Sequence, residues 1–164
     1  MSGILFSPQR QLYMTRISAN GKELTLKTMK TMNKPLSFFL PIIPPTVTHQ
    51  EKKVTVKNGK PVFYEPPELK DARAKLSAYL APHAPKQPFK KALRLIVKWC
   101  FPVTGKHADG EYKTTKPDTD NLQKLLKDVM TAVGFWKDDA LVCSEITEKF
   151  YAEKTGIFIM LMEL

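Results

Sequence analysis

The chain has few cysteines, histidines and glycines, and each scarcity argues against a class of site. Its two cysteines, Cys100 and Cys143, lie in apolar strand-like runs without a close partner. We therefore expect reduced core residues and a reducing compartment. The three histidines, His49, His83 and His107, share no ligand spacing, which argues against a zinc site. The glycines form neither a Gly-rich phosphate loop nor a Gly-x-Ser-x-Gly nucleophile elbow.

Long hydrophobic runs are also lacking. The longest apolar stretch, from Leu36 to Ile43, contains a serine and a proline and is too short to span a bilayer. The N-terminus has no basic-then-apolar signal pattern followed by small residues. We therefore expect an intracellular, cytoplasmic protein that does not enter a membrane.

Acidic residues are outnumbered, and the surplus of positive charge is uneven. The chain has 164 residues and a net charge of +10, with +9 on residues 50–116 and −4 on residues 117–164. Basic charge favours a partner with a phosphate backbone, although the solvated lysines of any basic protein give the same composition. The acidic block beside the basic one favours a nuclease, which has to capture phosphate and repel it at the same site.

The hydrophobic pattern predicts one folded domain. Residues 1–31 lack sustained periodicity and are expected to form a loosely ordered N-terminal extension, with the domain over residues 32–164. A polar loop is expected from Gly105 to Lys116. The fold class is α+β, with a mainly antiparallel or mixed sheet and two helices. Strands are predicted at Leu36–Ile43, Lys52–Val56, Pro61–Tyr64, Ala92–Phe101, Leu141–Phe150 and Ile157–Met162, and the first helix at Glu68–Leu80.

The second helix has the clearest pattern. Its apolar residues follow one face of a helix and are Leu122, Leu125, Leu126, Val129, Met130 and Val133. Asp120 is predicted to cap the helix, with Gln123 reaching back as a capping box. Gly134 is predicted to end it in a left-handed conformation.

An acidic group surrounds the start of this helix. Asp118 and Asp120 stand at the turn before it, Lys124 follows one turn later on the polar side, and Asp138 and Asp139 follow the helix. Carboxylate oxygens are the ligands that hard divalent cations prefer, and a lysine beside them can stabilise a phosphoryl transition state. If the strand after Asp139 lies alongside the helix, Asp139 can return to the helix N-terminus.

Structural explanations for the same residues remain open at this point. Asp120 can be only a helix cap, worth about 1 kcal/mol. Lys124 can simply pair with Asp128 four residues on, and the pair Asp138-Asp139 can be a solvated turn. Capping requires only one carboxylate, so the presence of Asp118 favours metal chemistry. The Pro-Asp…Asp/Glu-x-Lys pattern of restriction nucleases does not fit, because no Asp/Glu-x-Lys follows Asp118.

The two halves of this acidic segment resemble a known signature. Lys116 to Lys124 reads KPDTDNLQK and Gly134 to Ala140 reads GFWKDDA. Both, with the spacing between them, are similar to the motif of the RusA family of Holliday junction resolvases, which occurs in many prophages. Looser agreement covers residues 36–164.

The resemblance implies a homodimeric endonuclease, dependent on Mg²⁺ or Mn²⁺, that cuts four-way junctions by paired symmetric nicks in DNA recombination and repair. It assigns metal-binding roles to Asp118, Asp120 and Asp139 and an essential catalytic role to Lys124. Asp138 matches an adjacent acidic position and is expected to be a minor ligand or to support the ligands. Branched DNA is the expected partner, and no organic cofactor is expected.

The loop after Pro44-Pro45 departs from the better-known members of that family. It reads TVTHQEKK where they have a stretch rich in Asn, Arg and Tyr, so preferences for a DNA sequence or junction do not carry over. A non-catalytic DNA-binding dimer is the alternative, and a glycosyltransferase with an Asp-x-Asp motif is a remote one. The candidate contacts to the DNA backbone are Lys52, Lys53, Lys70, Arg73, Lys113 and Lys116.

Overall fold

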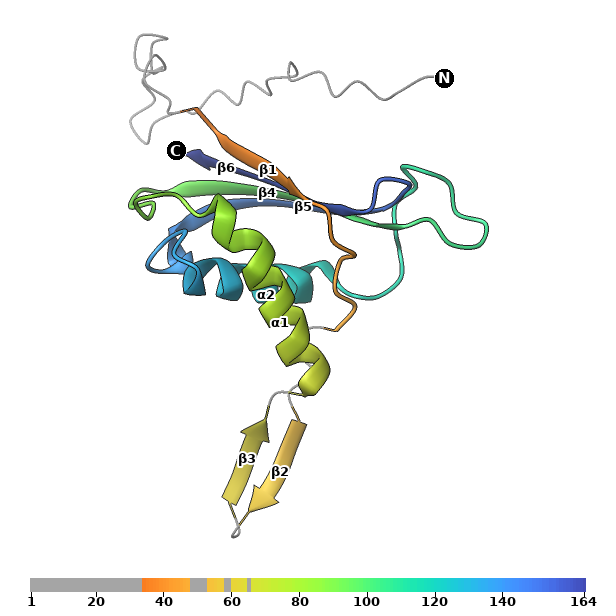
Figure 1. Ribbon diagram of the computed structural model, residues 1–164, viewed down its shortest axis with the longest axis horizontal. Coiled ribbons are helices and arrows are strands. Elements are labelled where there is room, and N and C mark those ends of the chain that lie inside the picture. The colour runs from red at the N-terminus through yellow and green to blue at the C-terminus, as the bar shows by residue number, and fades with distance from the viewer. Residues whose placement is uncertain (1–33, 48–52, 58–59, 65) are drawn as a thin grey trace, which may run out of the picture. The chain divides into compact units, whose positions relative to one another are not determined.

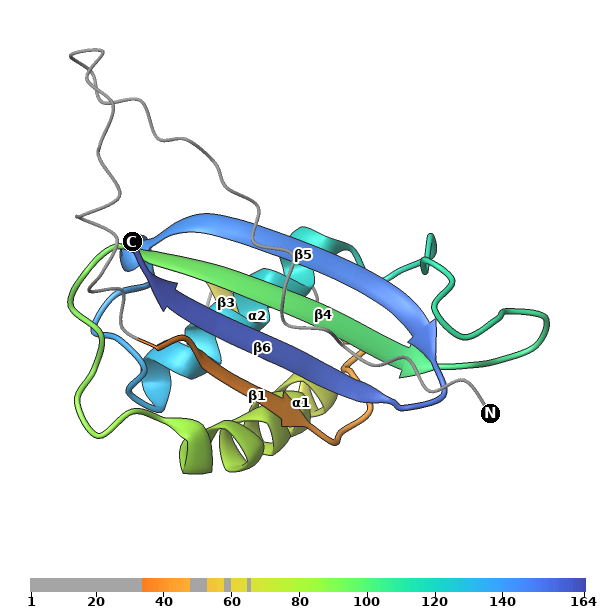
Figure 2. The ribbon, with the colours of Figure 1, turned by 90° about the horizontal axis from the view of Figure 1, so that it is seen from above.

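A computed structural model gives the fold, and it describes residues 34–47, 53–57, 60–64 and 66–164. The predicted N-terminal extension therefore lies outside the described residues. Four strands form one sheet in the order β1-β6-β4-β5, as Figure 2 shows from above. Their bounds are β1 Leu36–Leu40, β4 Leu93–Pro102, β5 Val142–Ala152 and β6 Gly156–Glu163. Only the β4–β5 pair is parallel, so the predicted α+β class with a mixed sheet is confirmed.

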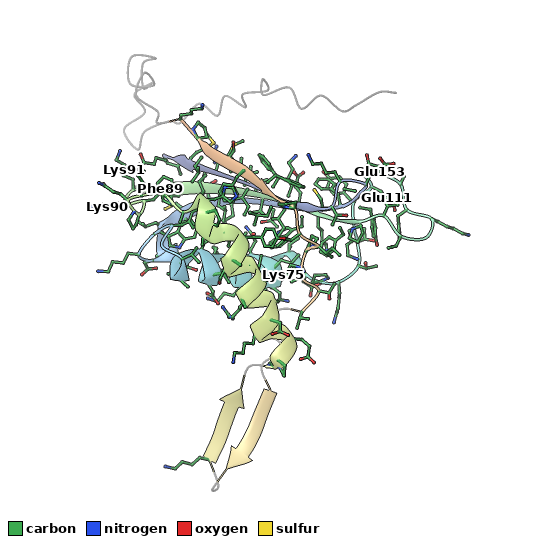
Figure 3. The ribbon with its side chains drawn as sticks, viewed as in Figure 1. Lys75, Phe89, Lys90, Lys91, Glu111 and Glu153 are labelled. Atoms are coloured by element: carbon green, nitrogen blue, oxygen red, sulfur yellow. The ribbon has the colours of Figure 1, made fainter. Side chains whose placement is uncertain are left out.

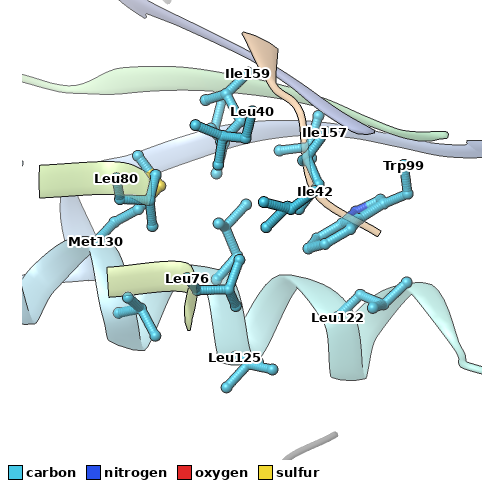
Figure 4. Close-up of a cluster of buried hydrophobic side chains, with 14 of the residues drawn as sticks. Leu40, Ile42, Leu76, Leu80, Trp99, Leu122, Leu125, Met130, Ile157 and Ile159 are labelled. Atoms are coloured by element: carbon cyan, nitrogen blue, oxygen red, sulfur yellow. The ribbon is translucent and has the colours of Figure 1, made fainter. Parts of the chain in front are cut away.

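Two helices cover one face of this sheet (Figure 1). Helix α1 spans Pro67–Leu80 and helix α2 spans Thr119–Ala132. Side chains alternate between the two faces of a strand, and every second residue of β4, from Leu93 to Phe101, is buried. The sheet and both helices enclose one apolar core, part of which is drawn in Figure 4.

The predicted stripe of α2 packs into this core. Leu122, Leu125, Leu126, Val129 and Met130 are buried, and Val133 is half-buried. At about 1.5–3 kcal/mol for each fully buried aliphatic side chain, this stripe fixes the rotation of α2 about its axis. The charged residues Lys124 and Asp128 consequently lie on the opposite side.

The end of α2 is the predicted glycine cap. Gly134 has a φ of +91°, a conformation that an L side chain adopts at a cost and glycine adopts freely. The Phe135 amide donates to the Met130 carbonyl and the Gly134 amide to the Thr131 carbonyl, at 3.0 and 3.1 Å. These two bonds make a Schellman motif, which stops the helix before the second half of the acidic segment.

Two further predictions are confirmed and one is wrong. The strands predicted at Lys52–Val56 and Pro61–Tyr64 are present as β2 Lys53–Lys57 and β3 Lys60–Tyr64, which pair as an antiparallel hairpin. The first helix, predicted at Glu68–Leu80, begins one residue earlier at Pro67. Proline is well tolerated at the first helical position, because the amide there has no partner within the helix. Cys100 is half-buried and Cys143 is exposed, and both are free thiols. The expectation that both cysteines belong to the core is wrong, because Cys100 alternates with the buried residues of β4 and Cys143 lies at the start of β5, an edge strand of the sheet.

The polar loop from Gly105 to Lys116 follows the free edge of β5. Gly110 donates to the Tyr151 carbonyl at 2.9 Å, and Tyr151 donates to the Glu111 carbonyl at 2.8 Å. The Lys113 amide donates to the Lys149 carbonyl at 2.9 Å. The loop is therefore held to the sheet immediately before it reaches α2. Across the described ranges, no helix combines the length and apolar character needed to cross a membrane.

Candidate active site

Asp118, and not Asp120, is the N-cap residue of α2. Its backbone is extended, with φ −76° and ψ 149°, and its carbonyl accepts the Leu122 amide at 3.1 Å. Its side chain is exposed and makes no cap hydrogen bond. Asp120 lies inside the first turn, where the helix dipole favours a negative charge. The predicted cap is therefore wrong by two residues, and both carboxylates remain exposed at the same end of the helix.

The predicted capping box fails for the same reason. A start at Asp118 moves Gln123 from the third helical position to the fifth, and there its side chain turns into the core. Gln123 is 4% exposed, and neither its amide nitrogen nor its amide oxygen has a hydrogen-bond partner among the described residues. A glutamine at the fifth position is too far along the helix to reach the cap.

Lys124 faces away from the core and forms the pair with Asp128 that the i+4 spacing allows. Its Nζ lies 2.9 Å from Oδ1 of Asp128, whose Oδ2 lies 3.5 Å from the Arg73 guanidinium of α1. The hydrogen bond and the charge of Asp128 raise the pKa of Lys124, with a smaller contribution from the charge of Asp139. Burial alone would raise the pKa of Asp128, but Lys124 and Arg73 outweigh it and hold that pKa below its usual value.

Helix α2 and strand β5 run in opposite directions. Lys149, near the end of β5, bonds to Pro117 just before α2, and Glu145, earlier in β5, pairs with Lys127 at 2.7 Å. Asp139 precedes β5, in a short 3-10 turn, η4, at Asp139–Leu141. It therefore lies toward the C-terminal part of α2, and the expectation that it returns to the helix N-terminus is wrong. Its charge acts on Lys124 instead.

The second half of the acidic segment has clear structural duties as well. Phe135 and Trp136 are buried, and Trp136 donates from its indole nitrogen to the Thr131 hydroxyl at 2.7 Å. Asp138 accepts the Ala140 amide at 2.8 Å and so caps the 3-10 turn. The Gly-Phe-Trp stretch thus anchors the chain between α2 and β5, and Asp138 shapes the turn that presents Asp139.

The chemistry of Asp118 and Asp120 fits a divalent cation. Two exposed carboxylates at one helix end are hard oxygen donors, and Mg²⁺ is commonly held by one or two carboxylates together with waters and substrate phosphates. In the part of the chain that the structure describes, no three Asp, Glu, His or Cys side chains gather as a metal-binding group. Within one chain the structure thus places Asp118 and Asp120 at the same helix end and leaves Asp139 apart from them.

One residue at this site was missed by the sequence reasoning. Lys149 donates from its Nζ to the carbonyl oxygens of Thr115 and Pro117, each at 2.8 Å. These partners are 34 and 32 positions away in the sequence, so no local pattern connects them. The available signal is weaker: Lys149 alternates with Thr147 and Tyr151 and so shares their face of β5.

The candidate DNA contacts differ in their surroundings. Lys70 on α1 and Lys116 before α2 are exposed, whereas Arg73 is engaged with Asp128. Lys113 is half-buried, with its Nζ 5.3 Å from the centre of the Phe101 ring. Lys53 belongs to β2, and Lys52 lies outside the described residues. Lys70 and Lys116 are thus the best-exposed candidates among the described side chains.

A family of known proteins matches the part of the chain that holds this candidate site. The family model described as endodeoxyribonuclease RusA matches residues 42–162. The crossover junction endodeoxyribonuclease rusA of Lactococcus phage r1t is 32% identical over 119 residues, in an alignment that covers 71% of this chain and 89% of that protein. The uncharacterised protein YqaN of Bacillus subtilis (strain 168) is 26% identical over 121 residues, in an alignment that covers 67% of this chain and 84% of that protein. The chain therefore belongs to the RusA family of endodeoxyribonucleases.

Proposed function

We propose that the protein is a metal-dependent, structure-selective endodeoxyribonuclease that resolves four-way DNA junctions by paired symmetric nicks in recombination and repair. The observation that carries this proposal is the start of α2. There Asp118 has no capping duty for its side chain, Asp120 stands beside it, and Lys124 follows one turn later. Similarity to a phage crossover junction endodeoxyribonuclease over most of both chains supports the same activity.

In this proposal Asp118 and Asp120 hold Mg²⁺ or Mn²⁺. Asp139, the third carboxylate of the family signature, contributes through its charge, which acts on Lys124. A bound divalent cation would activate a water molecule and neutralise charge that develops on the phosphate. Asp138 stays with the turn that it caps. The two carboxylates therefore bind and orient the cation at the helix end, where the positive end of the helix dipole also favours a phosphate group.

Lys124 stabilises the negative charge that develops during phosphodiester cleavage. Its side chain is 53% exposed, so a phosphate can reach the ammonium group. Asp128 holds this group in place and raises its pKa, so it remains protonated across the physiological range. A positioned cation of this kind acts where charge appears in the transition state and needs no proton transfer.

A homodimer would supply the two related cuts. A twofold axis places two identical sites in symmetric positions, which matches the symmetry of a four-way junction. The net charge of +10 favours contacts to the phosphate backbone, which position the DNA without reading its sequence. Selectivity is then expected to follow from the shape of the junction.

The test is a nicking assay on a mobile-arm four-way junction, with a linear duplex of the same sequence as the control substrate. Wild type should nick the junction symmetrically with Mg²⁺ and not in EDTA. Asp118→Asn should cut at least about 100-fold more slowly while it binds the junction as tightly. Asp71→Asn, an exposed aspartate of α1, is the matched control and should cut normally.

Two results would contradict the proposal. Wild type that binds junctions but never nicks them with Mg²⁺ or Mn²⁺ would identify a non-catalytic DNA-binding protein. An Asp118→Asn variant that nicks at the wild-type rate would remove the carboxylate pair from the mechanism. Calorimetric titration of Mn²⁺ without DNA adds a readout independent of cleavage, since the affinity should fall in Asp118→Asn and in Asp120→Asn.

A further inference from the structure

Lys149 is the residue that fixes the turn leading into Asp118. Its ammonium group donates one hydrogen bond to the Thr115 carbonyl and one to the Pro117 carbonyl, each at 2.8 Å. The backbone carbonyl of Lys149 also accepts the Lys113 amide at 2.9 Å. A single residue of β5 thus binds the loop at three points within five residues.

The strand gives Lys149 a defined direction. It lies beside Trp99 in the parallel β4–β5 register, and residues side by side on adjacent strands project from the same face of a sheet. Trp99 is fully buried against the helices, so Lys149 extends from the helix-covered face toward the start of α2. Its side chain is half-buried. The bond to the Pro117 carbonyl is part-buried, which limits competition from water there, whereas the bond to the Thr115 carbonyl is exposed.

The second of these carbonyls acts directly on Asp118. The Pro117 carbonyl and the Asp118 amide belong to one planar peptide group, so a bond to that oxygen fixes the orientation of the group. The Asp118 carbonyl is held on the other side by the Leu122 amide at 3.1 Å. With the backbone fixed on both sides, the direction of the Asp118 side chain from its Cα is set, although the carboxylate itself makes no cap bond.

We propose that Lys149 is a positioning residue, whose ammonium group aims the Asp118 carboxylate by holding the Thr115 and Pro117 carbonyls. This inference rests on the proposed nuclease function and adds a residue outside the acidic segment to it. Lys149 does not touch the substrate in this role. Its loss misplaces a reacting group while the core, built from other side chains, stays intact.

The decisive variant is Lys149→Met, which keeps an apolar side chain as long as the lysine stem and removes the ammonium group. Displacing a catalytic group by about 1 Å can cost about 100-fold in rate. We expect kcat for junction nicking to fall about 10- to 100-fold, with the junction Kd within about twofold of wild type and the melting temperature nearly unchanged. The amide resonance of Asp118 in a ¹H–¹⁵N spectrum should also shift, because it shares a peptide group with the Pro117 carbonyl.

Lys98→Met is the matched control. Lys98 is a half-buried lysine of the neighbouring strand β4. Its register partner is Glu148, the residue before Lys149, and the two side chains form an ion pair at 3.2 Å. Neighbouring residues along a strand project to opposite faces, so Lys98 lies on the face away from α2. Its variant should keep the wild-type kcat, Kd and Asp118 resonance. Lys149→Arg, which keeps the charge and the donors, should recover part of the activity that Lys149→Met loses.

Three outcomes would overturn the positioning role. The first is a Lys149→Met enzyme with wild-type kcat. The second is a loss of junction affinity equal to the loss of rate, which would make Lys149 a DNA contact. The third is an unmoved Asp118 resonance. If Lys149→Met does not fold, Lys149→Gln, which keeps one hydrogen-bond donor, is judged by the same criteria. Wild type that fails to cut any junction refutes the proposed function itself, whereas normal cutting by Lys149→Met refutes only this inference.

Discussion

The ion pair with Asp128 holds the Lys124 side chain and leaves it accessible to a substrate. Asp128 accepts its hydrogen bond at 2.9 Å, yet half of the Lys124 side chain stays exposed. Lys124→Ala should therefore abolish most junction nicking and leave junction binding within about threefold, because backbone affinity is shared among many cations. Single-turnover nicking and a gel-shift titration measure the two quantities. Lys75→Ala, an exposed lysine on α1, is the control, and a collapse of affinity in Lys124→Ala would assign Lys124 to binding.

Asp128 joins the two helices through charge, and its effect on stability should depend on pH. Its pKa is lowered in the folded protein by Lys124 and Arg73, against the effect of burial. A carboxyl group with a depressed folded pKa contributes stability above its unfolded pKa, and this contribution disappears as pH falls through the folded pKa. Asp128→Asn should cost roughly 1–2 kcal/mol at pH 7. The difference from wild type should begin to shrink below about pH 4 and vanish once the pH is below the lowered folded pKa.

Urea denaturation at pH 7, 5 and 3 checks this prediction. Asp71→Asn lies on the exposed surface of α1 and should follow wild type within about 0.5 kcal/mol at each pH. A destabilisation by Asp128→Asn that stays constant down to pH 3 would show that the loss comes from packing and not from the charge network.

At the scale of the element, α2 carries the core and the site on opposite faces. Leu126 is fully buried among residues of the core, so Leu126→Ala should lower the free energy of unfolding by roughly 2–5 kcal/mol. Leu164, which is 44% exposed at the end of the chain, supplies the matched control and should lose less than about 0.5 kcal/mol on the same change. Thermal and chemical denaturation measure both, and an unchanged Leu126→Ala would mean that the stripe does not hold the helix.

Periodicity along the chain predicts the elements well, and it predicts their ends less well. The stripe from Leu122 to Met130 and the two strands on either side of Asn58-Gly59 follow from local pattern, and the structure confirms both. The cap of α2 does not follow from local pattern, since Asp118 and Asp120 are equally good caps by residue type. The turn before the helix is held by a hydrogen bond from Lys149, 32 positions away, which no local pattern reveals.

The candidate site also depends in part on contacts between residues that are distant in the sequence. Residue types and spacing are enough to select Asp118, Asp120 and Lys124, because they lie within two turns of one helix. The position of Asp139 depends on the direction of β5 relative to α2, which the Lys127–Glu145 and Lys149–Pro117 contacts reveal. Arg73 also gains a partner on another helix, Asp128, that sequence spacing cannot supply.

At the scale of the whole molecule, labelled lysines and glutamates lie at opposite ends of the sheet. Figure 3 shows Lys90 and Lys91 at one end, and Glu111 and Glu153 at the other. Lys149 and the start of α2 belong to the second end, because Lys113 and Glu111 bond to β5 there. Lys116 is exposed and directly precedes the acidic start of α2, so a DNA backbone has to be held close to both signs of charge.

Junction binding should therefore weaken steeply with salt, because each neutralised phosphate releases counterions. With several phosphate contacts, raising NaCl from about 50 to 200 mM should reduce affinity by roughly 10³-fold or more. Lys116→Gln should reduce the slope of log K against log[salt] by about 1 if this exposed lysine contacts a phosphate. Lys91→Gln, at the other end of the sheet and paired with Glu163 at 3.3 Å, should leave the slope unchanged. Fluorescence anisotropy in EDTA measures binding without cleavage, and a flat salt response would contradict a phosphate-dominated interface.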